Sequence, residues 1–204
     1  MKKIVVFTVL FAFIFAGMAF AFKLPGLKGT LKKKEVELKL SDIDPALKDK
    51  EGTDMDPFKD KPYKYNVYGD KEFDGFFTSA HKVNAKITYM TYCIADVEKK
   101  LDTVKGAEAA AMQTEMENIA KMATSITGEA TSLIGNGQKL ISSAPNKFKK
   151  NPIDLKESGN LVKDLKASVE ALSSAGKGAG DVAKKAPALA TKLAEKAKEA
   201  AAGQ

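Results

Sequence analysis

Apolar residues recur at alternating spacings of three and four between residues 73 and 104. This spacing is typical of a long helix that turns one apolar face toward partner helices. Acidic residues lie in the first turns and lysines in the last ones, which suits the helix dipole. The pattern therefore predicts a helix over 70–105 that ends at Gly106. The positions of this first seam are Phe73, Phe76, Ala80, Val83, Ile87, Met90, Ile94, Val97, Leu101 and Val104.

A second seam with the same spacing predicts a helix over 107–142. Small residues recur in it every seven positions, at Ala123, Ala130 and Gly137, so a partner helix is expected to approach closely there. Two long helices joined around Gly106 should form an antiparallel hairpin. The positions of this second seam are Met112, Met116, Ile119, Ala123, Ile126, Ala130, Leu133, Gly137 and Leu140.

Two shorter helices are predicted over 152–174 and 181–201. Asn151 followed by Pro152 is a helix start, after a loop over 143–151. Gly176, Gly178 and Gly180 should end the third helix, and Pro187 should kink the fourth or mark its true start. The fold class predicted for 70–204 is therefore an all-α antiparallel bundle of about four helices, of which the first two are long.

The residues ahead of the bundle, 22–69, are expected to form an extended and mostly irregular segment. Residues 34–40 alternate apolar and charged side chains, as in a short strand, but no partner strand is evident nearby. Residues 41–69 contain three prolines and no sustained period, which indicates a long loop. Four aromatic residues should fasten this loop to the helices: Phe58, Tyr63, Tyr65 and Tyr68.

Residues 1–21 have the features of a bacterial signal peptide. Lys2 and Lys3 precede an apolar run, and Ala19-Phe20-Ala21 is a small-x-small cleavage site. We expect cleavage after Ala21 and export to the periplasm or beyond. The alternative is an uncleaved membrane anchor, because the apolar run approaches spanning length.

The charge pattern argues against a nucleic-acid partner. All 33 basic residues are lysine, and the net charge is +7. Lysine lacks the guanidinium fork that grips phosphate, and no basic stripe is interleaved with aromatic residues. Residues 145–204 carry 12 lysines against 7 acidic residues, so the positive charge gathers toward the C-terminus.

Few residues could support catalysis or metal binding. His81 is the single histidine and Cys93 the single cysteine. They are twelve residues apart, about 18 Å along a helix, so they cannot cooperate within it. Asp54, Asp56 and Asp60 only faintly resemble a calcium loop, since the glycine and the terminal glutamate are missing. We therefore expect no catalytic residue, no metal and no cofactor.

The function expected from these patterns is that of an exported, non-enzymatic structural or protein-interaction module, which binds a protein partner or itself. The alternative is a membrane-interacting helical protein that uses the low-charge stretch 123–144 or the basic C-terminal helix on anionic lipid. Cys93 is interpreted as a structural thiol, with an intermolecular disulfide or redox role as the alternative. Tyr89 and Tyr92 are expected on the outer face, covered by residues 58–68 or free to bind. The candidate interaction residues are Tyr89, Tyr92, Cys93, Lys184, Lys185, Lys192 and Lys196.

Overall fold

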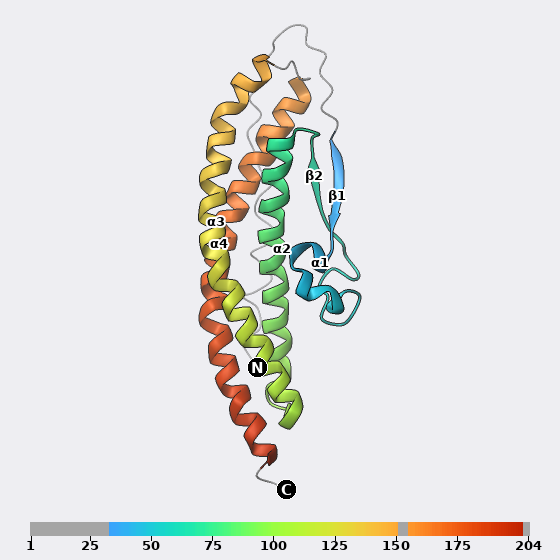
Figure 1. Ribbon diagram of the computed structural model, residues 1–204, viewed down its shortest axis with the longest axis vertical. Coiled ribbons are helices and arrows are strands. Elements are labelled where there is room, and N and C mark those ends of the chain that lie inside the picture. Colours follow the sequence, from blue (N-terminus) through green and yellow to red (C-terminus); the bar gives the residue numbers. More distant parts are fainter. Residues whose placement is uncertain (1–32, 151–154, 202–204) are drawn as a thin grey trace, which may run out of the picture.

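Three long helices run along the molecule, and a small N-terminal cap lies beside one of them (Figure 1). The computed structural model describes residues 33–150 and 155–201. We use "cap" for residues 34–67, which hold both strands and the two short helices. In chain order the elements are β1 (Lys34–Leu38), α1 (Leu40–Ile43), the 3₁₀ helix η1 (Pro45–Lys50), β2 (Tyr63–Val67), α2 (Lys71–Lys100), α3 (Gly106–Lys150) and α4 (Leu155–Ala201).

The bundle has three long helices, whereas the prediction was about four helices with the first two long. The helices expected over 152–174 and 181–201 are one helix, α4, with 47 residues. Helix α3 has 45 residues and continues through most of the predicted 143–151 loop, whereas α2 has 30. The last two helices are therefore the longest, not the first two. The predicted start at residue 152 and the predicted signal peptide lie outside the described residues.

Helix α4 continues through its glycines because its apolar spacing does not change there. Ala175 and Ala179 are 4% and 0% exposed, and they join the two predicted seams in one register. Each glycine costs a helix about 1 kcal/mol relative to alanine, and burial along this face offsets that cost. Gly178 also lies against α2, since a Cβ added there would be 3.4 Å from Ile87 Cγ2. Pro187 stays within the helix on its exposed side.

The three helices approach one another closely at Gly137 of α3. A Cβ added to this residue would lie 2.4 Å from Val169 Cγ2 and 2.7 Å from Phe76 Cζ. These are far below the separation of atoms in contact. Only glycine fits there without displacing either neighbour. The close approach predicted from the second seam is thus present at this position.

The cap adds a two-stranded sheet to the predicted helical bundle. Strand β1 lies within the predicted 34–40 strand, and it does have a partner, because β2 pairs with it antiparallel. Lys34 lies opposite Val67, and Leu38 lies opposite Tyr63. The segment expected to be irregular thus contains α1, η1 and β2. Asp44 caps η1, where its carboxylate accepts a hydrogen bond from the Ala46 backbone amide at 2.9 Å.

Helix α2 is buried on two faces. It begins at Asp70, whose carboxylate accepts hydrogen bonds from the amides of Glu72 and Phe73. The first seam packs toward α3 and α4, as the contacts at Gly137 and Gly178 indicate. A second set of buried residues lies beside that seam: Phe77, Ala85, Tyr89 and Cys93. The cap covers this second side.

A buried tyrosine joins the end of the cap to the far helix. Tyr68 is fully buried, and its ring lies 5.7 Å from that of Phe77 between centroids. Its hydroxyl donates to Asp164 Oδ2 on α4 at 2.6 Å. Burial, together with this hydrogen bond, raises the pKa of Tyr68. The phenol therefore stays a donor, and the cap, α2 and α4 are fixed to one another.

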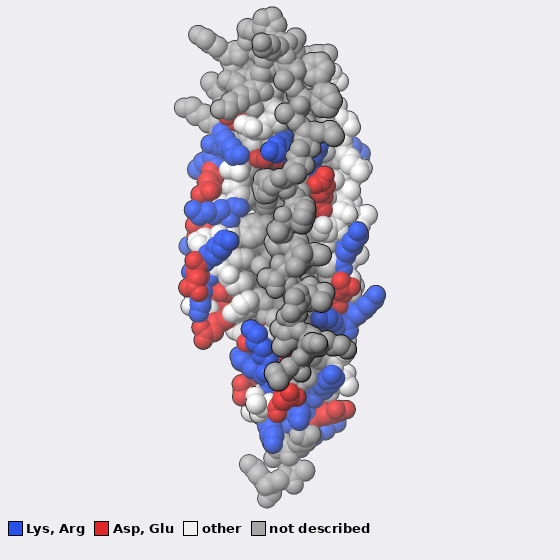
Figure 2. All heavy atoms as spheres, turned by 180° about the vertical axis from the view of Figure 1, so that it is seen from behind, with Lys and Arg blue, Asp and Glu red and all other residues white. Residues whose placement is uncertain are grey.

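The described surface is polar and its charges are mixed. Lysines and acidic residues are interspersed along the visible margins rather than gathered by sign (Figure 2). Within residues 33–150 and 155–201, Tyr92 is the large hydrophobic side chain that stays exposed, at 38%. No helix in these two ranges has a stretch long and apolar enough to cross a membrane.

Candidate functional site

A cleft of about 540 Å³ opens where η1, α2 and α3 meet. Its volume falls within the range of small-molecule sites, about 300–1,000 Å³. The three elements come from distant parts of the sequence, so only the folded chain creates this space. The lining residues are Asp44, Ala46, Leu47, Lys50, Lys86, Tyr89, Glu115, Asn118, Ile119, Lys121, Met122 and Ser125.

Glu115 links the three elements at this cleft. The hydroxyl of Tyr89 on α2 donates to Glu115 Oε1 at 2.7 Å, and Lys50 Nζ of η1 donates to Oε2 at 3.2 Å. Burial, with Cys93 and Glu115 nearby, raises the pKa of Tyr89, so its phenol remains protonated. Both carboxylate oxygens are thus held by protein donors, and the wall is ordered before any ligand arrives.

The rest of the lining divides into an apolar floor and a polar rim. Leu47 and Ile119 are 7% and 1% exposed and form part of the floor. Lys86 on the rim pairs with Glu129 at 3.3 Å. Lys121 is exposed, and no ion pair to it is present within the described part of the chain. The arrangement can bind an apolar body and hold an anionic group.

Tyr89 and Cys93 lie inside the molecule rather than on an outer face. Both are 0% exposed. The cover over Tyr89 includes η1 and Glu115, rather than the predicted 58–68 segment. Burial raises the pKa of the Cys93 thiol to about 12. A protonated and enclosed thiol is a poor nucleophile, so this position favours the structural role over a disulfide with another chain.

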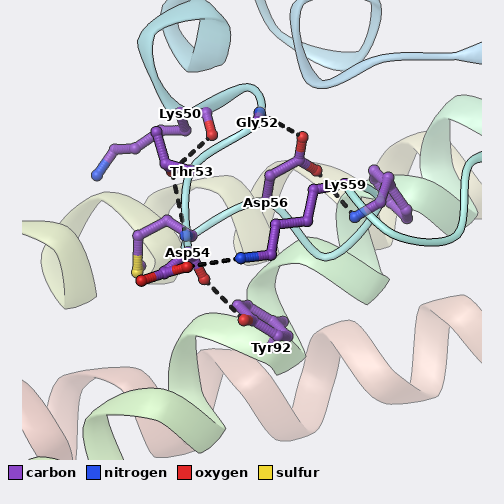
Figure 3. Close-up of polar contacts among 9 residues, drawn as sticks. Lys50, Gly52, Thr53, Asp54, Asp56, Lys59 and Tyr92 are labelled. Atoms are coloured by element: carbon purple, nitrogen blue, oxygen red, sulfur yellow. Dashed lines mark hydrogen bonds and ion pairs between the residues drawn. The ribbon is translucent and has the colours of Figure 1, made fainter.

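Of the three candidate residues on α2, Tyr92 is the one that reaches the surface, beside the 50–59 loop (Figure 3). Its hydroxyl donates to the backbone carbonyl of Asp54 at 2.7 Å. The Asp54 carboxylate pairs with Lys59 at 2.6 Å. The Tyr92 hydroxyl therefore links this loop to α2, which is a structural role.

The acidic residues of the same loop do not form a metal site. The Asp56 carboxylate accepts hydrogen bonds from the backbone amides of Gly52 and Phe58, at 2.9 and 2.8 Å (Figure 3). Its oxygens thus serve to shape the turn. Across the described residues, no three His, Cys, Asp or Glu side chains are placed so that they could hold a metal ion.

His81 is enclosed by the aromatic residues of the cap. Its ring stacks on that of Tyr65, with centroids 4.7 Å apart, and its Nδ1 lies 3.2 Å from the Tyr63 hydroxyl. Burial lowers the pKa of His81 to about 4 and raises that of Tyr63 to about 12. The sequence identified His81 only as the single histidine and did not reveal its aromatic partners.

The predicted lysines lie along the C-terminal half of α4. Lys184, Lys185 and Lys192 are exposed and Lys196 is partly exposed. Lys185 lies 3.5 Å from Glu98 of α2, an ion pair at the surface. These lysines are far in sequence from the cleft, and none lines it. The seven candidate residues thus fall into three groups. Tyr89 and Cys93 are buried, Tyr92 contacts the 50–59 loop, and the four lysines lie along the surface of α4.

Sequence reasoning missed the cleft and most of its lining. One signal was present, because Tyr89 and Cys93 lie off the first seam on a second apolar side of α2 that needed a cover. Comparison of the chain with family models, with curated proteins and with solved structures found no match.

Proposed function

We propose that this protein is an exported, non-enzymatic interaction module of the bacterial envelope. The observation that carries the proposal is the burial of His81 and Cys93, the two most reactive side chains of α2. His81 is stacked among tyrosines with a pKa near 4, and Cys93 is fully buried with a pKa near 12. Neither is poised for proton transfer or nucleophilic attack at neutral pH.

The surface offered to a partner is the outer side of α3 and α4. At 1.5 Å per residue, α4 with its 47 residues is about 70 Å long. Its inward positions, such as Leu165, Leu172 and Leu193, are fully buried, and Lys184 and Lys192 on its outward side are exposed. The lysines on this side are the recognition groups of the proposal, for a protein partner or a second copy.

Site-specific photo-crosslinking in native cells tests this proposal. A photoreactive residue replaces Lys184 or Lys192 on α4, and Glu37, exposed on β1, is the matched control. The expected result is one discrete adduct shared by both α4 positions and absent at Glu37. Its mass distinguishes a partner from a second copy. The absence of any discrete adduct from α4, or the same adducts from Glu37, contradicts the proposal.

A second candidate function is binding to an anionic lipid surface, and the exposed Lys184, Lys185 and Lys192 favour it. The apolar side of α4 faces the bundle, so this binding would be electrostatic and weakened by salt. In the 123–144 stretch, Ile126 and Ala130 are also buried, and insertion there would require the bundle to open. Co-sedimentation with anionic vesicles at low salt supports this candidate, and its absence excludes it.

A further inference from the structure

We propose that the cleft between η1, α2 and α3 binds a small amphipathic anion, an apolar chain or ring that carries one carboxylate. This site is separate from the α4 surface of the proposed function, and neither depends on the other. The apolar body would lie on Ala46 and Met122, over the buried Leu47 and Ile119, and the carboxylate would lie toward Lys121.

The charges around the cleft select an anion. Its lining contains two carboxylates, and both already have protein donors. Glu115 accepts from Tyr89 and Lys50, and Asp44 accepts from the Ala46 amide. Glu115 thus has a donor at each oxygen, one of them the Lys50 ammonium, and Asp44 has a donor at Oδ1.

The lysines of the lining are used unequally. Lys50 and Lys86 each have a carboxylate partner, at 3.2 and 3.3 Å. Lys121 extends from the exposed side of α3 and has no ion pair within residues 33–150 and 155–201. An incoming carboxylate would thus meet an ammonium that has no carboxylate partner within the described residues. The nearby Asn118 and Ser125 supply further polar contacts at the rim.

The walls of the cleft are held before binding, which lowers the entropic cost of capturing a ligand. Tyr89 and Ile119 are 0% and 1% exposed, so they cannot rotate away from the floor. Lys50 is tied across the cleft to α3 through Glu115. A short carboxylate with an apolar chain can contact both the apolar and the polar residues of the lining.

Titration with octanoate, followed by ¹⁵N–¹H NMR on the processed chain (residues 22–204), tests this proposal, with octylammonium as the probe of opposite charge. We expect saturable shifts at the amides of Lys50, Asn118 and Lys121, and binding of octylammonium at least tenfold weaker. Lys121→Glu should weaken octanoate binding at least tenfold. Lys139→Glu, the matched control about 27 Å further along α3, should leave it unchanged.

Three results would overturn the assignment. The first is the absence of saturable octanoate shifts in the cleft. The second is equal binding of octanoate and octylammonium, which would indicate an apolar contact without charge selection. The third is an equal loss of affinity in both lysine variants, which would indicate a general charge effect.

Discussion

The ring of His81 lies over that of Tyr65, with centroids 4.7 Å apart and 28° between the planes. This contact joins α2 to β2 and keeps the imidazole partly buried. Burial removes water from the ring and disfavours its protonated, charged form. The pKa of His81 is therefore lowered from 6.5 to about 4. A group intended for catalysis would need a pKa near the working pH, so the stacking indicates a structural histidine.

The lowered pKa of His81 predicts loss of stability in mild acid. As the pH falls below 6.5, the unfolded chain takes up a proton at this residue, whereas the folded chain does not until about pH 4. The free energy of unfolding should therefore fall through this window, by about 3 kcal/mol in total, since one unit of pKa difference is worth about 1.4 kcal/mol. Urea unfolding at pH 7 and pH 4 measures this change.

The His81→Phe variant is the control for this prediction. It keeps an aromatic ring against Tyr65 but has no proton to bind. The difference in unfolding free energy between the native chain and the variant should thus depend on pH only between about 4 and 6.5. A difference that is the same at pH 7 and at pH 4 would show that His81 is not enclosed as described.

Substitution of glycines in α3 should have opposite effects at two positions. Gly137→Ala should destabilise by about 1–3 kcal/mol, because the new Cβ meets Val169 and Phe76 and overpacks the core. Gly128→Ala should stabilise by about 1 kcal/mol, because nothing lies within 4 Å and alanine favours the helix. Thermal unfolding of both variants checks this contrast, and stabilisation by both would contradict the three-helix contact at Gly137.

Removal of the Tyr68 hydroxyl should loosen the link between the cap and α4. Tyr68→Phe removes a buried hydrogen bond to Asp164 and should cost about 1.5–3 kcal/mol, the usual range for a charged acceptor. Tyr92→Phe removes an exposed bond to a backbone carbonyl and should cost only about 0.5 kcal/mol. Denaturant unfolding of the pair measures the difference. Equal costs would mean that Tyr68 does not join the cap to the bundle.

The buried thiol of Cys93 should be unreactive in the folded chain. At pH 8 a thiol reagent should label it only at the rate of local or global opening, because its pKa is about 12 and no surface is exposed. A cysteine placed at exposed Lys184, in a Cys93→Ala background, should react at once. Rapid labelling of Cys93, or a covalent dimer on non-reducing gels, would instead support the disulfide alternative.

Several elements could be predicted from spacing alone, because burial imposes the period of a helix on its apolar residues. The start of α2 at Asp70 and the inward set that includes Ala80, Val83 and Met90 follow directly from it. The continuity of α4 was missed because Ala175 and Ala179 are weakly apolar and stand among glycines. Their spacing nevertheless continues the three-and-four pattern from Leu172 to Val182.

The cap and the cleft were harder to predict. Strand β2 alternates Tyr63, Tyr65 and Val67, which is a strand signature, but Pro62 and neighbouring charges made it resemble a loop. The cleft depends on contacts such as Lys50 with Glu115, which are 65 residues apart. No local pattern encodes such a contact. Sequence spacing identifies which residues are buried, but not which distant segment covers them.

The continuity of α4 through its glycines is the feature on which the elongated shape and the lysine row both depend. It can be measured as the distance between spin labels at positions 166 and 192, both exposed, in a Cys93→Ala background. An uninterrupted helix places these positions about 39 Å apart, at 1.5 Å per residue. A narrow distribution near this value is the predicted result. A distance below about 20 Å, as in a helical hairpin that turns at Gly176–Gly180, would contradict it.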